Sequence, residues 1–422
     1  MKRQLILTVC LFGFLLFSLN AQADGPDYSV KNLANGTRIV YKVIPQAKTV
    51  NIRIVLPVGF VNESHQLRGI SHLLEHLIYR GSERISREQF HSLITYRGGS
   101  YNGFTMMNRT EYILEVTPEN LESSLQAYLE LILFPGLAET NIVLEKRVVT
   151  VEKAMRTIPG NTFFLYLNEL TEKQFDDSVK NISRDDLLKY HQQFYQPENM
   201  IVIVTGAFKA KELAELISKY PDSGLKETSE QLNELRIKGP GSEVVLEDYL
   251  LGEQYQLLYG FNLQELSGKD LAIAKVLPLI LNYESRQYDY INNRPLDYQI
   301  FLYNLAGDNM LIFQYRDCLA PYSSEIENWH QKNLARFFKY LGAKKFDKFL
   351  NYIVKYFDKY FEAVELDSGA LNDYLDQYLF EPTAITEKDL SAIKNLSSSD
   401  FKKFVEKYLD GKKYQKIIVK AL

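Results

Sequence analysis

The sequence contains few of the residues that cross-link or specialise a fold. Its 422 residues include 2 cysteines, 1 tryptophan and 6 histidines. Cys10 lies in an apolar N-terminal stretch, so if that stretch is removed only Cys318 remains and no disulfide can form within the chain. The net charge of −4 comes without a strongly basic run, which argues against nucleic acid as a partner.

The apolar N-terminal stretch is too short to cross a membrane as a helix. A positively charged start precedes the apolar segment from Leu5 to Leu19, and the small residues of Ala21-Gln22-Ala23 follow it. This order predicts a signal peptide over residues 1–23. We therefore expect a periplasmic or secreted protein with no stable membrane anchor once the signal is cleaved. An uncleaved membrane anchor is the alternative.

The remaining chain is predicted to be a duplicated unit. Residues 182–195 and 396–409 carry matching apolar residues at helical spacing, offset by 214 positions, and strand patterns follow at 200–204 and 416–419. Short strands grouped with longer helices predict an α+β fold. We expect two homologous α/β-sandwich-like halves, each a mostly antiparallel sheet with helices packed on one face.

Five consecutive residues, His72-Leu73-Leu74-Glu75-His76, carry the clearest chemical pattern. On a helix, His72 and His76 project from one face a turn apart, the spacing at which two imidazoles can hold one Zn²⁺. Glu75 reaches the same face, where it is placed to take a proton from a metal-activated water. An amphipathic helix with two solvated histidines is the alternative, and the scarcity of histidine in this chain argues against it.

A catalytic zinc site usually needs a third protein ligand. Glu145 and Glu152 are seven residues apart, two helical turns, so both carboxylates lie on one face of a predicted helix. Such a pair alone is typical of a solvated helix face. Beside the histidine pattern, it is the best candidate for the missing ligand.

With these motifs, the chain resembles the pitrilysin/insulinase family of zinc metallopeptidases, and among them the bacterial relatives of mitochondrial processing peptidase. The resemblance implies one Zn²⁺ per chain, bound by His72, His76 and Glu152. It also implies that Glu75 is the general base and that Glu145 is a supporting catalytic carboxylate. The implied activity is that of a zinc metalloendopeptidase, which hydrolyses peptides or unfolded polypeptide segments.

The segment from Gly98 to Thr105 resembles the edge strand that passes the active site in this family. The resemblance implies that Gly99 and Asn102 bind substrate there. An extended peptide could add to such an edge through backbone hydrogen bonds.

The second half has lost the metal ligands. We expect a catalytic zinc-binding domain over residues 24–220, a linker over 221–243 and a non-catalytic homologous domain over 244–422. In family members that act alone, the second half supplies an arginine and a tyrosine, seven residues apart, that hold the substrate. The nearest candidates here, Arg294 and Tyr298, are only four apart.

A complete zinc set beside a degraded arginine–tyrosine pair predicts a heterodimer. Its partner would be a paralogous subunit that lacks zinc ligands, and we favour this assembly over a homodimer. The alternative function is that of a non-catalytic peptide-binding or assembly subunit with the same fold.

Overall fold

A computed structural model of the chain defines the fold. The structure describes residues 25–155, 163, 166, 171–221, 241–248, 254–264, 266–285, 290–291, 294–295, 298–305, 308–319, 328, 330, 343–409 and 414–421. The predicted signal peptide and most of the predicted linker lie outside these residues. No helix of the described ranges is long and apolar enough to cross a lipid bilayer.

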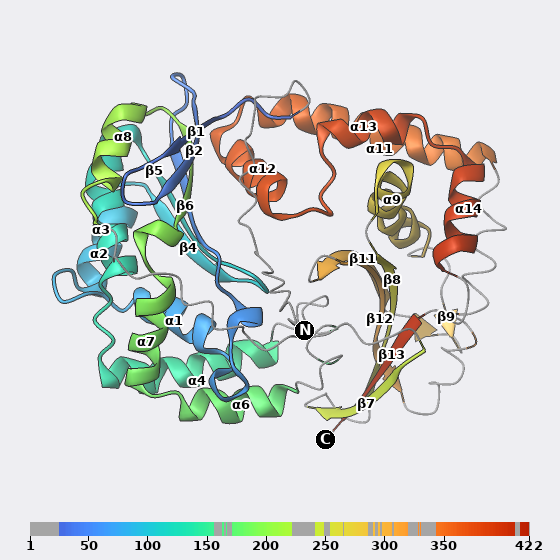
Figure 1. Ribbon diagram of the computed structural model, residues 1–422, viewed down its shortest axis with the longest axis horizontal. Coiled ribbons are helices and arrows are strands. Elements are labelled where there is room, and N and C mark those ends of the chain that lie inside the picture. The colour runs from blue at the N-terminus through green and yellow to red at the C-terminus, as the bar shows by residue number, and fades with distance from the viewer. Residues whose placement is uncertain are drawn as a thin grey trace, which may run out of the picture.

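The first half is a six-stranded sheet with a layer of helices on one face (Figure 1). The strands follow the order β1-β2-β6-β3-β5-β4, and every neighbouring pair is antiparallel except β2 and β6. They are β1 (Ser29–Asn32), β2 (Arg38–Val43), β3 (Val50–Leu56), β4 (Ser100–Thr105), β5 (Thr110–Val116) and β6 (Ile201–Gly206). The helices are α1 (Ile70–Ile78), α2 (Arg87–Thr95), α3 (Leu121–Leu133), α4 (Glu139–Met155), α6 (Glu172–Asn181), α7 (Arg184–Phe194) and α8 (Ala210–Ile217).

The second half repeats this topology with a five-stranded sheet. Its order is β11-β12-β8-β13-β7, again with one parallel pair, β13 and β7. Strand for strand, β7-β13-β8-β12-β11 corresponds to β2-β6-β3-β5-β4 of the first half. The strands are β7 (Glu243–Asp248), β8 (Gln254–Gln264), β11 (Tyr298–Leu305), β12 (Asp308–Leu319) and β13 (Tyr414–Ala421), with β9 (Tyr290–Ile291) and β10 (Arg294–Pro295) as a separate pair. The predicted α+β fold of two homologous halves is confirmed.

The duplication extends to helix capping. The helices of the second half are α9 (Gly268–Ser285), α11 (Ala343–Val364), α12 (Ser368–Phe380), α13 (Glu387–Lys394) and α14 (Ser398–Tyr408). Ser183 caps α7 by accepting a hydrogen bond from the backbone N–H of Asp186, and Ser397 caps α14 in the same way through Asp400. Because an N-cap depends only on neighbouring residues, the repeated sequence produces the same helix start twice.

Helix α12 and Phe163 show that the two halves are not packed independently. Alternate residues of β3 face opposite sides: Ile54 joins the core under α1, whereas Val55 joins the core that includes α12. Figure 1 shows α12 beside β6, on the side of the sheet away from α1 and α7. Likewise, Phe163 of the first half packs on the second sheet. A Cβ on Gly260 of that sheet would lie 2.1 Å from the Phe163 ring. Each sheet therefore has its second face covered by residues of the other half.

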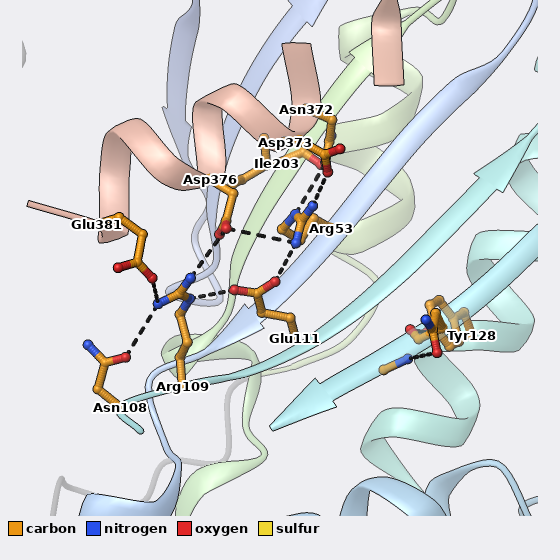
Figure 2. Close-up of polar contacts among 12 residues, drawn as sticks. Arg53, Asn108, Arg109, Glu111, Tyr128, Ile203, Asn372, Asp373, Asp376 and Glu381 are labelled. Carbon is orange, nitrogen blue, oxygen red and sulfur yellow. Dashed lines mark hydrogen bonds and ion pairs between the residues drawn. The ribbon is translucent and has the colours of Figure 1, made fainter. Parts of the chain in front are cut away.

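Four buried charged residues, which we call the charge cluster, join α12 to the first sheet (Figure 2). They are Arg53 on β3, Arg109 and Glu111 at the start of β5, and Asp376 on α12. Glu111 pairs with both arginines, and the Oδ2 atom of Asp376 lies 3.3 Å from Nη2 of Arg109 and 3.8 Å from Nη1 of Arg53. The half-exposed Glu381 adds a contact of 2.8 Å to Arg109. Two basic and two acidic side chains are thus buried together at the contact between the halves.

Candidate metal centre

The start of α1 is fixed by a buried carboxylate. Oε2 of Glu63 accepts a hydrogen bond of 2.8 Å from the Gly69 amide, and Oε1 accepts one of 3.0 Å from the Ser71 amide. These are N–H groups that a helix start leaves without partners. Burial raises the pKa of Glu63 to about 7, against the opposing effect of these hydrogen bonds. The Glu63 contacts therefore set where α1 begins and which way it faces.

Packing of α1 brings His72 and His76 to the side of α4. Ile70, Leu73, Leu74 and Leu77 are buried in the core of the first half. The two histidines are partly exposed on another side of the helix and face the carboxylate of Glu152. The helical spacing expected from the sequence thus places both imidazoles beside a third candidate ligand.

The three side chains fit the geometry of a zinc site. One donor atom from each of His72, His76 and Glu152 can be chosen so that all lie within 4.8 Å of one another. The Nε2 atoms of the histidines are 3.2 Å apart, and Oε2 of Glu152 lies 3.6 Å from His72 Nε2 and 3.2 Å from His76 Nε2. Two donors bound to zinc at 2.0–2.1 Å and a tetrahedral angle would be about 3.3–3.4 Å apart. The donor set and its spacing therefore match a three-ligand zinc site.

Glu145 lies behind His76 and not among the donors. Its Oε2 atom is 2.9 Å from Nδ1 of His76, and its Oε1 atom pairs with Arg80. A carboxylate can only accept here, so Nδ1 carries the hydrogen and the lone pair of Nε2 is left for a metal. Burial raises the pKa of Glu145, but the hydrogen bonds with His76 and Arg80 lower it more, and the net pKa is below its usual value.

Glu75 is held by the edge strand. Thr105 Oγ1 on β4 donates a hydrogen bond of 2.8 Å to Oε2 of the buried Glu75 carboxylate. A Cβ on Gly103 would lie 2.8 Å from Glu75 Oε1 and 2.9 Å from the hydroxyl of Tyr79. Only a residue without a side chain lets β4 approach α1 this closely. The strand thereby fixes the orientation of the carboxylate predicted to be the base.

The predicted substrate residues Gly99 and Asn102 lie at β4, the last strand of the first sheet. Asn102 alternates with Gly103 and Thr105, so its exposed side chain lies on the opposite face of the strand from Glu75. Its backbone carbonyl accepts a hydrogen bond of 3.0 Å from the Tyr128 hydroxyl, which anchors the strand. Gly99 precedes the strand, and a Cβ there would lie 2.7 Å from the carbonyl oxygen of Glu115.

The predicted substrate residues of the second half are only partly described. Arg294 lies in β10 and Tyr298 begins β11. Their side chains lie outside the described part of the chain, so only their backbone positions are known.

Sequence reasoning missed two residues of the site, Arg80 and Thr105. Arg80 is four residues after His76, so helical spacing could have indicated that it continues the same face. Thr105 is two residues after Gly103 in the same strand, so strand alternation could have placed it toward α1. Neither signal identifies a partner, because the contacts depend on where α4 and β4 pack.

Comparisons with known proteins agree with this arrangement. Residues 38–163 match the family model of insulinase (peptidase family M16), and residues 181–341 match that of the peptidase M16 inactive domain. The chain is 27% identical over 336 residues to a protein named zinc protease PqqE of Helicobacter pylori, covering 74% of this chain and 75% of that protein. It is also 27% identical over 217 residues to a probable mitochondrial-processing peptidase subunit beta of Arabidopsis thaliana, covering 49% of this chain and 40% of that protein.

Solved structures share the fold across nearly the whole chain. The crystal structure of a protease from Helicobacter pylori matches with a TM-score of 0.77 at 20% identity, covering 94% of this chain and 100% of that chain. The first half of the periplasmic protease PqqL from Escherichia coli matches with a TM-score of 0.68 at 16% identity, covering 94% of this chain and 92% of that chain.

Proposed function

Because this chain belongs to the peptidase M16 (insulinase) family, we propose that it is a zinc-dependent endopeptidase acting on peptides or unfolded polypeptide segments. The observation that carries the proposal is the spacing of 3.2–3.6 Å among the three donor atoms of His72, His76 and Glu152. These residues would hold the metal. Bound zinc would supply a Lewis acid that polarises a substrate carbonyl and acidifies a water.

In this proposal Glu75 moves the proton. Its carboxylate accepts a proton from the attacking water and returns it to the amine that leaves. The hydrogen bond from Thr105 holds Oε2 in place, so the base does not have to reorganise during the reaction. Glu145 orients His76 through Nδ1 and takes no part in the proton transfer.

Substrate would bind along β4. In the part of the chain that the structure describes, the outer side of β4 pairs with no other strand. An extended peptide could therefore add there by backbone hydrogen bonds, which tolerate many side chains. Asn102 and Gly99 lie along this edge, which supports their role in substrate binding.

We further propose that the protein acts in the periplasm or outside the cell, as the zinc-bearing subunit of a heterodimer. The N-terminal signal pattern supports the first point, and one structural neighbour is named a periplasmic protease. The second rests on the complete set of zinc ligands beside Arg294 and Tyr298, which are four residues apart and not seven. One relative is named as a subunit of a processing peptidase.

The test is an assay of the purified mature chain, loaded with zinc, on a mixed peptide pool. Glu75→Gln is the matched control, because it removes the base while leaving the three candidate ligands in place. Cleavage by the wild type that disappears in the variant supports the peptidase. Cleavage without a partner also contradicts the obligate heterodimer.

If neither protein cleaves although each binds one zinc, the partner subunit is required or the chain only binds peptides. Adding candidate paralogues from the same genome separates these two. Cleavage that survives Glu75→Gln would contradict the assigned base.

A further inference from the structure

We propose that Arg80 is a positioning residue for the metal centre. It holds the carboxylate of Glu145, Glu145 in turn orients the imidazole of His76, and Arg80 thereby sets the affinity for zinc. This inference rests on the proposed zinc function and adds a residue outside the ligand set. Arg80 touches no candidate metal ligand in the contacts described, and its effect passes through the Glu145 carboxylate.

The end of α1 aims Arg80 at α4. The helix ends at Ile78, and the Arg80 amide donates a hydrogen bond of 2.9 Å to the carbonyl of Leu77, which keeps the chain in a further turn. Gly81 then redirects the backbone with a φ of +106°. Arg80 is therefore held one turn beyond His76, on the side where Glu145 approaches.

The guanidinium engages one oxygen of Glu145 through two nitrogens. Both Nε and Nη2 of Arg80 contact Oε1, whereas Oε2 faces Nδ1 of His76. Two contacts from a planar group hold the position of Oε1 more firmly than a single contact can, and the contact of Oε2 with His76 then sets the plane of the carboxylate. With Oε1 committed to Arg80, Oε2 is directed at the imidazole, and the ring presents Nε2 to the metal donors.

Arg80 also compensates the charge of a carboxylate whose side chain is only 3% exposed. A buried carboxylate is stable only when opposite charge and hydrogen bonds replace the lost water. His76 is neutral when it binds a metal, so it cannot supply that charge. Lys146, the nearest lysine in sequence, donates to the Lys180 carbonyl instead. In the described ranges, Arg80 is the arginine or lysine side chain that pairs with Glu145.

The experiment measures zinc affinity by competition with a chelator for the wild type and five variants. Arg80→Met removes the charge and keeps the length, and Arg80→Lys keeps the charge and removes the planar fork. Arg84→Met is the control, since Arg84 lies in the same loop, is 80% exposed and pairs with Glu130. We expect Arg80→Met to weaken zinc binding about 10–100-fold, Arg80→Lys to restore part of it and Arg84→Met to leave it unchanged.

A double variant separates positioning from general damage. If Arg80 acts through Glu145, then Arg80→Met combined with Glu145→Gln binds zinc no more weakly than Glu145→Gln alone. Urea unfolding of the zinc-free proteins checks that each variant folds. Wild-type affinity in Arg80→Met, or effects of the two substitutions that multiply, overturns the inference while the zinc function stands. A wild-type chain that binds no zinc overturns both.

Discussion

Replacing Glu111 with glutamine would remove a negative charge from the centre of the charge cluster. Glu111 is fully buried and pairs with Arg53 and Arg109, both almost fully buried. In the variant, two buried guanidinium groups would face one buried carboxylate, that of Asp376. We expect the variant to fold but to lose stability at the contact between α12 and the first sheet.

The magnitude follows from the burial. Breaking a buried ion pair by neutralising one partner costs about 3–5 kcal/mol, because the other charge stays buried without compensation. Three features reduce the loss here, and the first is that Asp373 still pairs with Arg53 and Glu381 with Arg109. The glutamine carbonyl still accepts a hydrogen bond from one arginine, and Asp376 no longer feels the repulsion of Glu111. We therefore expect a decrease of about 3 kcal/mol in the free energy of unfolding.

The assay is urea unfolding at pH 8, followed by far-ultraviolet circular dichroism. Glu115→Gln is the matched control, since Glu115 lies on the same strand and face but is exposed. An exposed substitution of this kind changes stability by less than about 0.5 kcal/mol. A Glu111→Gln variant as stable as Glu115→Gln would show that the charge cluster does not stabilise the contact between the halves, and would refute the reasoning.

Three further predictions follow from the structure. Burial and the charge of Glu111 raise the pKa of Asp376 to about 7, so the native state binds this proton more tightly than the unfolded chain. The free energy of unfolding should therefore fall as pH rises from about 4 to about 7. In urea unfolding measured across this pH range, Asp376→Asn should remove that part of the fall. In thermal unfolding, Gly69→Ala should destabilise the protein by more than Gly98→Ala. Both glycines have positive φ, but only at Gly69 would the new Cβ meet a neighbour, 2.6 Å from Val179 Cγ2. Equal losses would show that packing adds nothing to the backbone strain. Zinc at 100 times its dissociation constant should stabilise the wild type by about 2.7 kcal/mol and His76→Ala by much less. Calorimetry with and without a chelator measures the stabilisation. Equal stabilisation of the two proteins would place zinc elsewhere.

The sequence by itself determined the features whose causes lie within a few residues. The spacing of His72 and His76 placed two imidazoles on one helical face, and α1 covers that segment as expected. The serines before Asp186 and Asp400 cap both copies of the repeated helix. These outcomes depend on helix geometry and on hydrogen bonds between residues close in sequence, so they do not require the tertiary structure.

Residue spacing alone could not identify Glu152 as the third ligand, since a glutamate pair two turns apart is common on solvated helices. The resemblance to a known family supplied the choice, and the structure brings the donor atoms within 3.2–3.6 Å. Arg80 and Thr105 could have been suspected from spacing, but their partners Glu145 and Glu75 could not, because each contact joins two separately formed elements.

Only the tertiary structure decided how the two halves meet. Arg53 contacts Asp373, 320 residues away, and Asn372 donates to the carbonyls of Asn51 and Ile203. Alternation along β3 places Asn51 and Arg53 on a polar face, and only the structure shows that this face is buried as well. Which element covers that face depends on the complementarity of surfaces that exist only after both halves have formed. The location of α12 on the first sheet, and with it the charge cluster, is therefore a property of the folded chain and not of any local pattern.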